Sequence, residues 1–223
     1  MKNTRHLIGI IVMAILLLLL LPYAVDMISV MFTSKRFTVW QQLSLYQWLP
    51  VGFAIYIVMR RLAPSNALWL ETFTHESIHA VMALIHGRQI LQFVAGVKGG
   101  CVYSTGRNHI GETAITLSPY CLPMYVYPLL VTRSIVNTEY LWLPDIFIGF
   151  ALCLHAYCFV TQTSTQQPDI RSFPFVYSYL YIGCGLLMNF CIIWVSFFSQ
   201  HNLFTSFWRM ICAVWDNFAG LFV

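Results

Sequence analysis

The chain has 223 residues, of which 59% are hydrophobic and only 9% are charged. Soluble domains carry about 25% charged residues, and a soluble fold of this size cannot hide so much apolar surface. We therefore expect an all-α, polytopic integral membrane protein. The net charge of +4 is modest, and its Lys and Arg residues lie at the ends of apolar runs. This distribution argues for interfacial anchoring and against nucleic-acid binding.

Six apolar segments predict membrane spans, because a transmembrane helix needs about 17–25 apolar residues. They are residues 7–32, 43–59, 66–85, 113–131, 143–160 and 173–198. No small-residue cleavage site follows the first apolar run at once, so we expect a retained span and not a cleaved signal peptide. Pro119 and Pro123 should break or kink the fourth span.

Two other segments have patterns of their own. Residues 91–104 alternate around several glycines, which predicts a small β-hairpin between the third and fourth spans. A plain connecting loop is the alternative. The tail from Leu203 carries aromatic and aliphatic residues at helical spacing, with Arg209 and Asp216 opposite. This pattern predicts an amphipathic helix in the membrane interface.

The charges do not decide how a six-span chain is oriented. If the N-terminus is cytoplasmic, six basic residues fall on each side of the membrane. The positive-inside rule needs an excess on one side and therefore does not assign an orientation. The inner set is residues 2, 5, 60, 61, 133 and 209, and the outer set is residues 35, 36, 88, 98, 107 and 171.

The third predicted span carries the sequence His75-Glu76-Ser77-Ile78-His79. On a helix, His75 and His79 project from one face and can bind one ion at about 2.0–2.1 Å. Glu76 projects beside them and can accept a proton from a water on that ion. Three ionisable side chains at bilayer depth are costly without a compensating ion. The motif predicts a Zn²⁺ site with Glu76 as general base.

A catalytic zinc ion takes three protein ligands, so the third must come from another segment. Pro168 forces Gln167 into an extended conformation and fits the first turn of a new helix, which can turn Asp169 inward. His155 is the rival, because it lies in the middle of a span where packing needs no histidine. The residues favour Asp169 and leave His155 open.

Other polar residues near the motif have expected roles. If Asp169 is the ligand, His155 and Gln162 lie two turns apart on one face and are candidates for polarising a substrate carbonyl. Glu71, one turn before His75, is expected to hydrogen-bond an imidazole.

These residues resemble the site-2 protease family of intramembrane zinc metalloproteases. The shared elements are the motif inside an apolar span, the Gly-rich hairpin ending Gly99-Gly100, and Gln167-Pro168-Asp169 opening a later span. The resemblance covers residues 66–190 and implies that Asp169 completes the zinc site. The family's Asn-Pro-Asp-Gly reads Gln-Pro-Asp-Ile here, and Ser118 to Pro123 replace its Gly-Pro-x-x-Asn pattern.

The resemblance implies a hydrolase that cleaves a transmembrane or membrane-anchored polypeptide. An exposed strand in the hairpin can hold an unwound substrate extended, so Gly99, Gly100 and Gln162 are candidate substrate-binding residues. Two functional alternatives stay open. One is a metalloprotease acting on peptides at the membrane surface, and the other is a zinc-binding membrane protein without protease activity.

We expect three regions in the chain. Residues 1–65 form two transmembrane helices, residues 66–200 form a zinc metalloprotease-like core, and residues 201–223 form the interfacial helix. The expected location is a bacterial inner membrane, crossed several times, with the lipid bilayer and a polypeptide substrate as partners.

Overall fold

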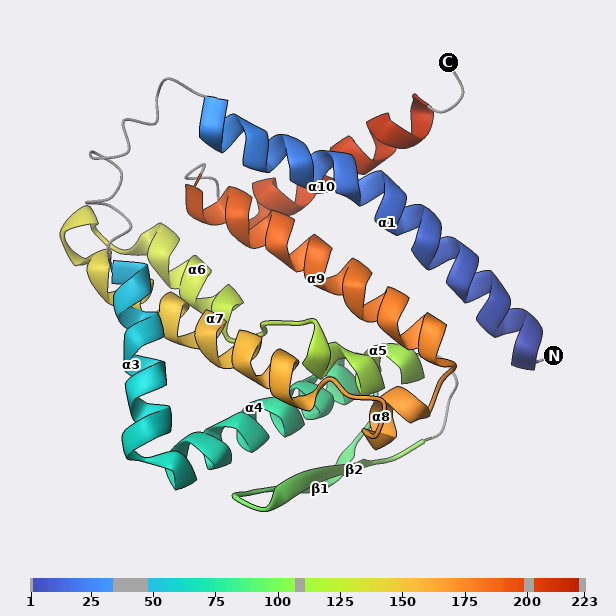
Figure 1. The fold of residues 1–223 in the computed structure, drawn as a ribbon, viewed down its shortest axis with the longest axis horizontal. Helices are drawn as coiled ribbons and strands as arrows, with labels where there is room; N and C mark the ends of the chain where they lie inside the picture. Colours follow the sequence, from blue (N-terminus) through green and yellow to red (C-terminus); the bar gives the residue numbers. More distant parts are fainter. Residues whose placement is uncertain (1, 34–47, 107–110, 199–202, 221–223) are drawn as a thin grey trace.

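The computed structural model describes residues 2–33, 48–106, 111–198 and 203–220, and these are mostly helical (Figure 1). Three of the described helices contain stretches long and apolar enough to cross a membrane. They are α1 (Lys2–Thr33), α7 (Trp142–Gln162) and α9 (Phe175–Phe198). They coincide with the first, fifth and sixth predicted spans, so the prediction of a helical, membrane-spanning protein is supported.

The remaining helices are shorter or more polar than these three. They are α3 (Trp48–Leu62), α4 (Pro64–Ile85), α5 (Glu112–Leu117), α6 (Val126–Ile135), α8 (Pro168–Arg171) and α10 (Leu203–Ala219). The first five residues of the predicted second span, 43–47, lie outside the described residues. The fourth predicted span is broken at its prolines, as expected: Pro119 lies in the 3-10 turn η1 (Ser118–Tyr120), and Pro123 lies in the turn before α6.

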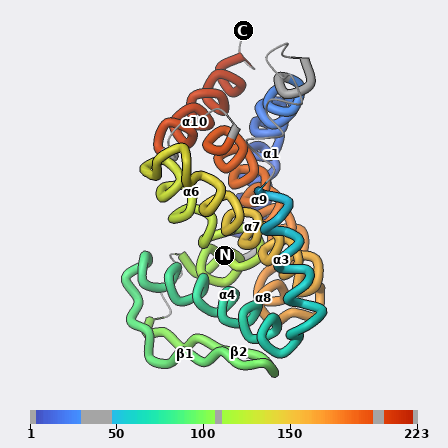
Figure 2. The backbone as a smooth tube through the Cα atoms, turned by 90° about the vertical axis from the view of Figure 1, so that its left-hand side faces the viewer, coloured from blue at the N-terminus to red at the C-terminus, as the bar shows by residue number. Residues whose placement is uncertain are grey.

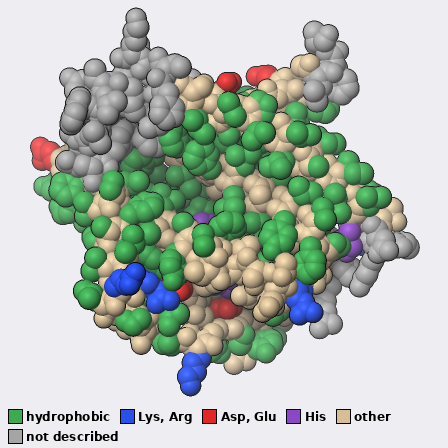
Figure 3. All heavy atoms as spheres, viewed as in Figure 1, with side chains coloured by type: hydrophobic (Ala, Val, Ile, Leu, Met, Phe, Trp, Pro, Cys, Tyr) green, Lys and Arg blue, Asp and Glu red, His purple; other side chains and the backbone are tan. Residues whose placement is uncertain are grey.

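Much of the molecular surface is apolar, which fits a membrane protein. On the face shown in Figure 3, hydrophobic side chains are spread over the whole surface, between backbone and other side chains. Leu7, Ile8 and Leu18 of α1 are more than half exposed. Such a continuous apolar surface is rare on soluble monomers and is expected where lipid surrounds the protein.

Helices α1 and α9 lie side by side, and α10 packs against both (Figures 1 and 2). Leu20 and Ala24 of α1 share an apolar cluster with Cys191 of α9 and Met210 of α10. The predicted C-terminal helix is therefore present, and its outer face carries exposed aromatic residues such as Trp215. Helices α1 and α9 run in the same direction, whereas α7 runs opposite to both (Figure 1).

The predicted hairpin is present and covers α4. Strands β1 (Ile90–Gly96) and β2 (Gly99–Ser104) pair antiparallel. Gly87, with φ of 73°, ends α4 and turns the chain back toward β1. The ring of Phe93 on β1 then packs against Phe73 on α4, with centroids 5.7 Å apart. Figure 2 shows α4 lying across the lower part of the molecule, with the hairpin on its outer side.

Helices α3 and α7 approach each other backbone to backbone. A Cβ atom built on Gly52 of α3 would lie 2.0 Å from the Ile146 carbonyl oxygen of α7. A Cβ atom on Gly149 of α7 would lie 2.1 Å from the Leu49 carbonyl oxygen of α3. Small residues at such crossings let membrane helices pack closely without a hydrophobic driving force between them.

We predict that Gly149→Leu lowers the free energy of unfolding by about 1–3 kcal/mol, because the side chain must push α3 away from α7. The matched control is Gly183→Ala in α9, where an added Cβ meets nothing within 4 Å. Thermal unfolding of the purified protein in detergent measures both changes. An unchanged midpoint in Gly149→Leu would contradict the close packing of these two helices.

Candidate metal centre

Helix α4 presents the two motif histidines toward one point. Pro64 in its first turn starts the helix, and the ring centroids of His75 and His79 lie 4.9 Å apart. Both side chains are mostly buried, with exposed fractions of 14% and 13%. A buried pair of imidazoles at helical spacing is the arrangement expected of two ligands to one ion.

A second, very short helix brings Asp169 to the same point. Gln167 is extended, with ψ of 131°, and Pro168 opens α8, as the sequence predicted. The Asp169 Oδ2 atom lies 3.5 Å from His75 Nε2 and 3.3 Å from His79 Nε2. The structure therefore brings Asp169, and not His155, into a group with the two histidines that could hold a metal ion.

The three candidate ligand atoms form a nearly equilateral triangle. Its third edge, from His75 Nε2 to His79 Nε2, is 3.2 Å. A tetrahedral ion with ligands at about 2.0–2.2 Å would hold them about 3.3–3.6 Å apart. The donor atoms present, two imidazole nitrogens and one carboxylate oxygen, are also of the kind that zinc binds at catalytic sites. The residues therefore fit a bound Zn²⁺ ion in both chemistry and spacing.

The hydrogen bonds around the triangle support this arrangement. His79 Nδ1 lies 2.7 Å from the Ile115 carbonyl oxygen of α5. Because a carbonyl only accepts, Nδ1 carries the hydrogen, and Nε2 is left with its lone pair toward the other two ligands. Metal-binding histidines are commonly oriented by such a bond.

Tyr120 of η1 holds the carboxylate from the other side. Its hydroxyl group donates to Asp169 Oδ2 at 3.1 Å, and its ring lies edge-on to His75, with centroids 5.3 Å apart. Burial raises the pKa of Asp169, but its contacts with His75 and His79 outweigh burial and hold that pKa below its ordinary value. The carboxyl group is thus kept ionised, as a metal ligand must be.

Glu76 lies beside the triangle in a cavity of about 420 Å³. The same cavity is lined by the three candidate ligands, by Arg88 and by Gly100 on β2. A Cβ atom on Gly100 would lie 2.5 Å from Glu76 Cγ, so only glycine lets the strand approach so closely. Glu76 is 8% exposed and is covered by the hairpin.

Two predicted site residues lie elsewhere. His155 is buried in α7, where its Nε2 atom finds no partner among the described residues. Gln162 is the last residue of α7. Neither belongs to the described residues that line the cavity, and Gln167 lies there instead. Gly99, the first residue of β2, is also outside the lining, while its neighbour Gly100 is within it.

The expectation for Glu71 was wrong. Its carboxylate accepts a hydrogen bond from the Tyr56 hydroxyl at 2.8 Å and forms a 2.8 Å ion pair with Arg60. Both partners lie on α3, so Glu71 joins α4 to α3 and does not contact an imidazole. Spacing along α4 showed that Glu71 lies on the same face as His75 and His79. It could not show that Arg60 of α3 would pair with Glu71.

Sequence reasoning missed Tyr120 and Arg88. Tyr120 lies where the family pattern is interrupted, and an aromatic residue in an apolar run gives no polar signal of its own. Arg88 follows the helix-ending Gly87 and reads as an ordinary interfacial anchor. Comparison of the chain with protein-family models, with curated proteins and with solved structures gave no match.

We predict that the purified protein carries one Zn²⁺ ion per chain and that His75→Ala, His79→Ala and Asp169→Ala each lower this content. His155→Ala should retain the ion, because His155 lies outside the triangle. Elemental analysis of the purified variants measures the content. Loss of zinc in His155→Ala together with retention in Asp169→Ala would exchange the two assignments.

We also predict that Tyr120→Phe weakens zinc affinity by about 10–100-fold, because the bond that orients Asp169 is lost. Competition with a chelator measures the affinity. The control is Tyr127→Phe, which removes a hydroxyl group bonded to Asn189 away from the cavity. Equal affinities in the two variants would mean that Tyr120 does not position the ligand.

Proposed function

We propose that this chain is an intramembrane zinc metalloprotease that hydrolyses a peptide bond in or near the transmembrane segment of its substrate. One observation carries the proposal: Glu76 shares a single cavity with a His75–His79–Asp169 triangle whose edges match a tetrahedral zinc site. A purely structural metal site has no need of a carboxylate beside its ligands. An uncoordinated carboxylate at a site with three protein ligands is expected where water is the reactant.

The proposed reaction divides the work between the ion and the protein. A bound zinc ion lowers the pKa of a water to about 7, so that hydroxide is available at neutral pH. Glu76 accepts the proton of the attacking water on its carboxylate and returns it to the leaving amine. Gly100 and the rest of β2 cover Glu76 and shield it from bulk solvent. The proton that Glu76 accepts is therefore passed to the leaving amine and not to solvent.

The hairpin can present the substrate. Four residues of β2, namely Gly100, Cys101, Val102 and Ser104, line the cavity. No described strand other than β1 pairs with β2, so its other edge can accept an extended peptide by β-augmentation. A helical substrate segment must unwind first, and backbone hydrogen bonds to β2 replace those it loses.

Arg88 lines the same cavity. We propose it for the role predicted for His155 and Gln162, which is to polarise the substrate carbonyl. Its guanidinium group is a donor of fixed charge at the site. In the proposed reaction it stabilises the negative charge that develops on the substrate carbonyl oxygen. His155 is buried in α7 outside the cavity lining and has no role in the proposed reaction.

The helix directions also support a proposal for the number of membrane crossings. The sequence predicts six, with α4 as the third. Because α7 runs opposite to α1 and α9, an even number of crossings must separate α1 from α7 if all three helices span, and two fit the helices that lie between them. Helix α3 provides one, and the broken segment α5–η1–α6 provides the other. We therefore favour five crossings, with α4 and its hairpin held at one end of the bundle.

The experiment that tests the function is Glu76→Gln, which should retain zinc and slow peptide cleavage by about 10²–10⁴-fold through loss of the general base. Cleavage of a membrane-inserted model polypeptide in liposomes is followed by mass spectrometry, with zinc content measured beside it. The control is Glu112→Gln, an exposed carboxylate outside the cavity lining.

Each outcome separates the proposal from its alternatives. Undiminished cleavage in Glu76→Gln would remove the proposed base. Faster cleavage of soluble peptides than of membrane-inserted ones would favour a protease that acts at the membrane surface. Zinc retention without cleavage of any substrate by the unaltered protein would favour a zinc-binding membrane protein.

A further inference from the structure

We infer that the protein holds one acyl chain of a membrane phospholipid in a second cavity, between α1 and α9. This cavity has a volume of about 290 Å³ and shares η1 and the end of α4 with the metal site. The inference rests on the lining, the depth and the hydrogen bonds of the cavity, and it does not depend on the proposed reaction.

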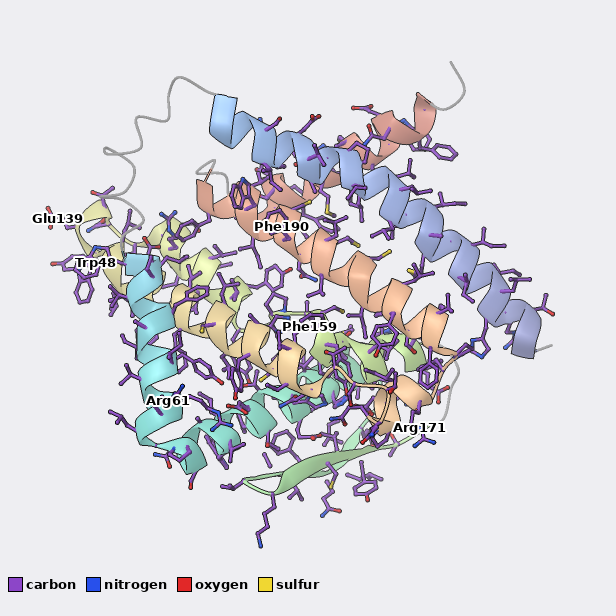
Figure 4. The ribbon with its side chains drawn as sticks, in the orientation of Figure 1. Trp48, Arg61, Glu139, Phe159, Arg171 and Phe190 are labelled. Atoms are coloured by element: carbon purple, nitrogen blue, oxygen red, sulfur yellow. The ribbon has the colours of Figure 1, made fainter. Side chains whose placement is uncertain are left out.

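The lining of this cavity is mainly hydrocarbon and sulfur. Its apolar side chains include Met13 and Leu16 of α1, Met82 of α4, and Met188 and Ile192 of α9. Figure 4 shows sulfur atoms in the space between α1 and α9. Methionine side chains are flexible and polarizable, so they can adapt to the shape of an apolar ligand.

The cavity lies halfway along two candidate membrane spans. Leu16 is at the middle of the apolar stretch of α1, which covers residues 4–29, and Gly185 is at the middle of that of α9, which covers residues 175–197. The two helices lie side by side (Figure 1). The hydrocarbon core of a bilayer is about 30 Å thick and surrounds the middle of a spanning helix. The medium at this depth is therefore acyl chain, and neither water nor headgroup.

The most polar side chain in the lining, Asn189, is already bonded to the protein. Its amide group donates to the carbonyl oxygens of Cys121 and Gly185 at 3.0 and 2.6 Å. Its side-chain oxygen accepts a hydrogen bond from the Tyr127 hydroxyl. These bonds use both amide hydrogens, so Asn189 has no donor left for a ligand.

The other polar groups in the lining are paired as well. The Cys184 thiol donates to the Met13 carbonyl oxygen at 3.0 Å. The side chains of Ser118 and Tyr181 are hydrogen-bonded to each other. A buried water needs two to four polar partners, roughly, and a headgroup needs more. The paired lining therefore favours a ligand without polar atoms.

The size of the cavity and its surroundings identify that ligand as an acyl chain. An apolar cavity of about 150 Å³ lined by aliphatic and aromatic residues stays dry and binds benzene, and this one is larger. A membrane helix, about 10–12 Å across, is too wide to enter it. The cavity is only partly enclosed, and Val12 and Ile15, on the outer face of α1, are 51% and 45% exposed. Lipid chains thus surround the helix that forms one wall, and a chain that enters restores the dispersion contacts that an empty cavity lacks.

A bound acyl chain would pack against segments that also hold the metal site. Ser118 lines the apolar cavity, and Tyr120, two residues later, donates to Asp169. On α4, Met82 lines the apolar cavity, and its neighbour Ala83 lines the metal-site cavity. The chain therefore supports η1 and the end of α4 in the positions that the metal site requires.

Photochemical cross-linking tests the inference on the unaltered protein. The full chain is placed in liposomes containing a phosphatidylcholine with a diazirine near the end of one acyl chain. After illumination, mass spectrometry should find cross-links on Cys121 and Cys184, which are only 4% and 2% exposed, as well as on lipid-facing Leu18. Ile148, which is buried outside this lining, is the internal control and should carry none. Cross-links confined to exposed side chains would overturn the inference. So would a cross-link at Cys121 from a photoreactive transmembrane peptide but not from the lipid.

A matched pair of variants shows whether the cavity is the binding site. Leu16→Trp should fill part of the cavity and lower cross-linking to Cys121 by roughly tenfold, because a packed interior leaves no room for both groups. Leu18→Trp makes the same change on the exposed face of the same helix and should leave the yield unchanged. Equal yields in the two variants would count against the cavity.

Native mass spectrometry of the detergent-purified protein gives a second measurement. The unaltered chain and Leu18→Trp should retain a bound phospholipid, and Leu16→Trp should retain less. An unaltered chain that carries no phospholipid would contradict the inference. This measurement and the cross-linking of the unaltered chain need no variant, so they decide the question even where Leu16→Trp fails to fold.

Discussion

The convergence of α4 and α8 on one point is the constraint on which the rest of the fold depends. Two imidazoles and a carboxylate must meet at 3.2–3.5 Å within an apolar bundle. Two of the three are held by hydrogen bonds from other segments: His79 by the Ile115 carbonyl and Asp169 by the Tyr120 hydroxyl. Pro168 opens α8, which carries Asp169. A small shift of any one segment would open the triangle. The interrupted helix between Glu112 and Tyr120 therefore helps to hold the site together, because it carries both Ile115 and Tyr120.

The same principle governs the charges outside the site. Ionisable groups within a membrane bundle are costly unless they are paired. Glu71 is paired with Arg60 and hydrogen-bonded by Tyr56, and Asp145 is paired with Arg133. Both pairs join consecutive or neighbouring helices near a bundle end. The three residues of the candidate metal site differ from these pairs, because two imidazoles and one carboxylate converge on a single point.

Local sequence patterns predicted much of this structure, because local rules determine those parts. The spacing of His75 and His79, the helix start at Pro168, the hairpin around its glycines and the break at Pro119 all follow from the properties of a few adjacent residues. The partner of Glu71 and the position of Tyr120 depend on how distant helices pack, and no local pattern contains that information. Whether α4 crosses the bilayer is not determined by its composition, because an apolar run of spanning length looks the same whether it crosses a bilayer or lies at its edge.

For the proposed hydrolysis, placing α4 at one end of the bundle would also resolve the conflict between a reaction that needs water and an apolar surrounding. A peptide bond cannot be hydrolysed without water, yet the helices around the site expose apolar surface to lipid. The cavity is lined on one side by α4 and on the other by β2 and Gln167, which are polar or backbone surfaces at the boundary of the bundle. Water can enter there without crossing the apolar core. In the proposed reaction, the end of a substrate helix is the part that would unwind into the cavity at the lowest cost, because its backbone hydrogen bonds are already incomplete.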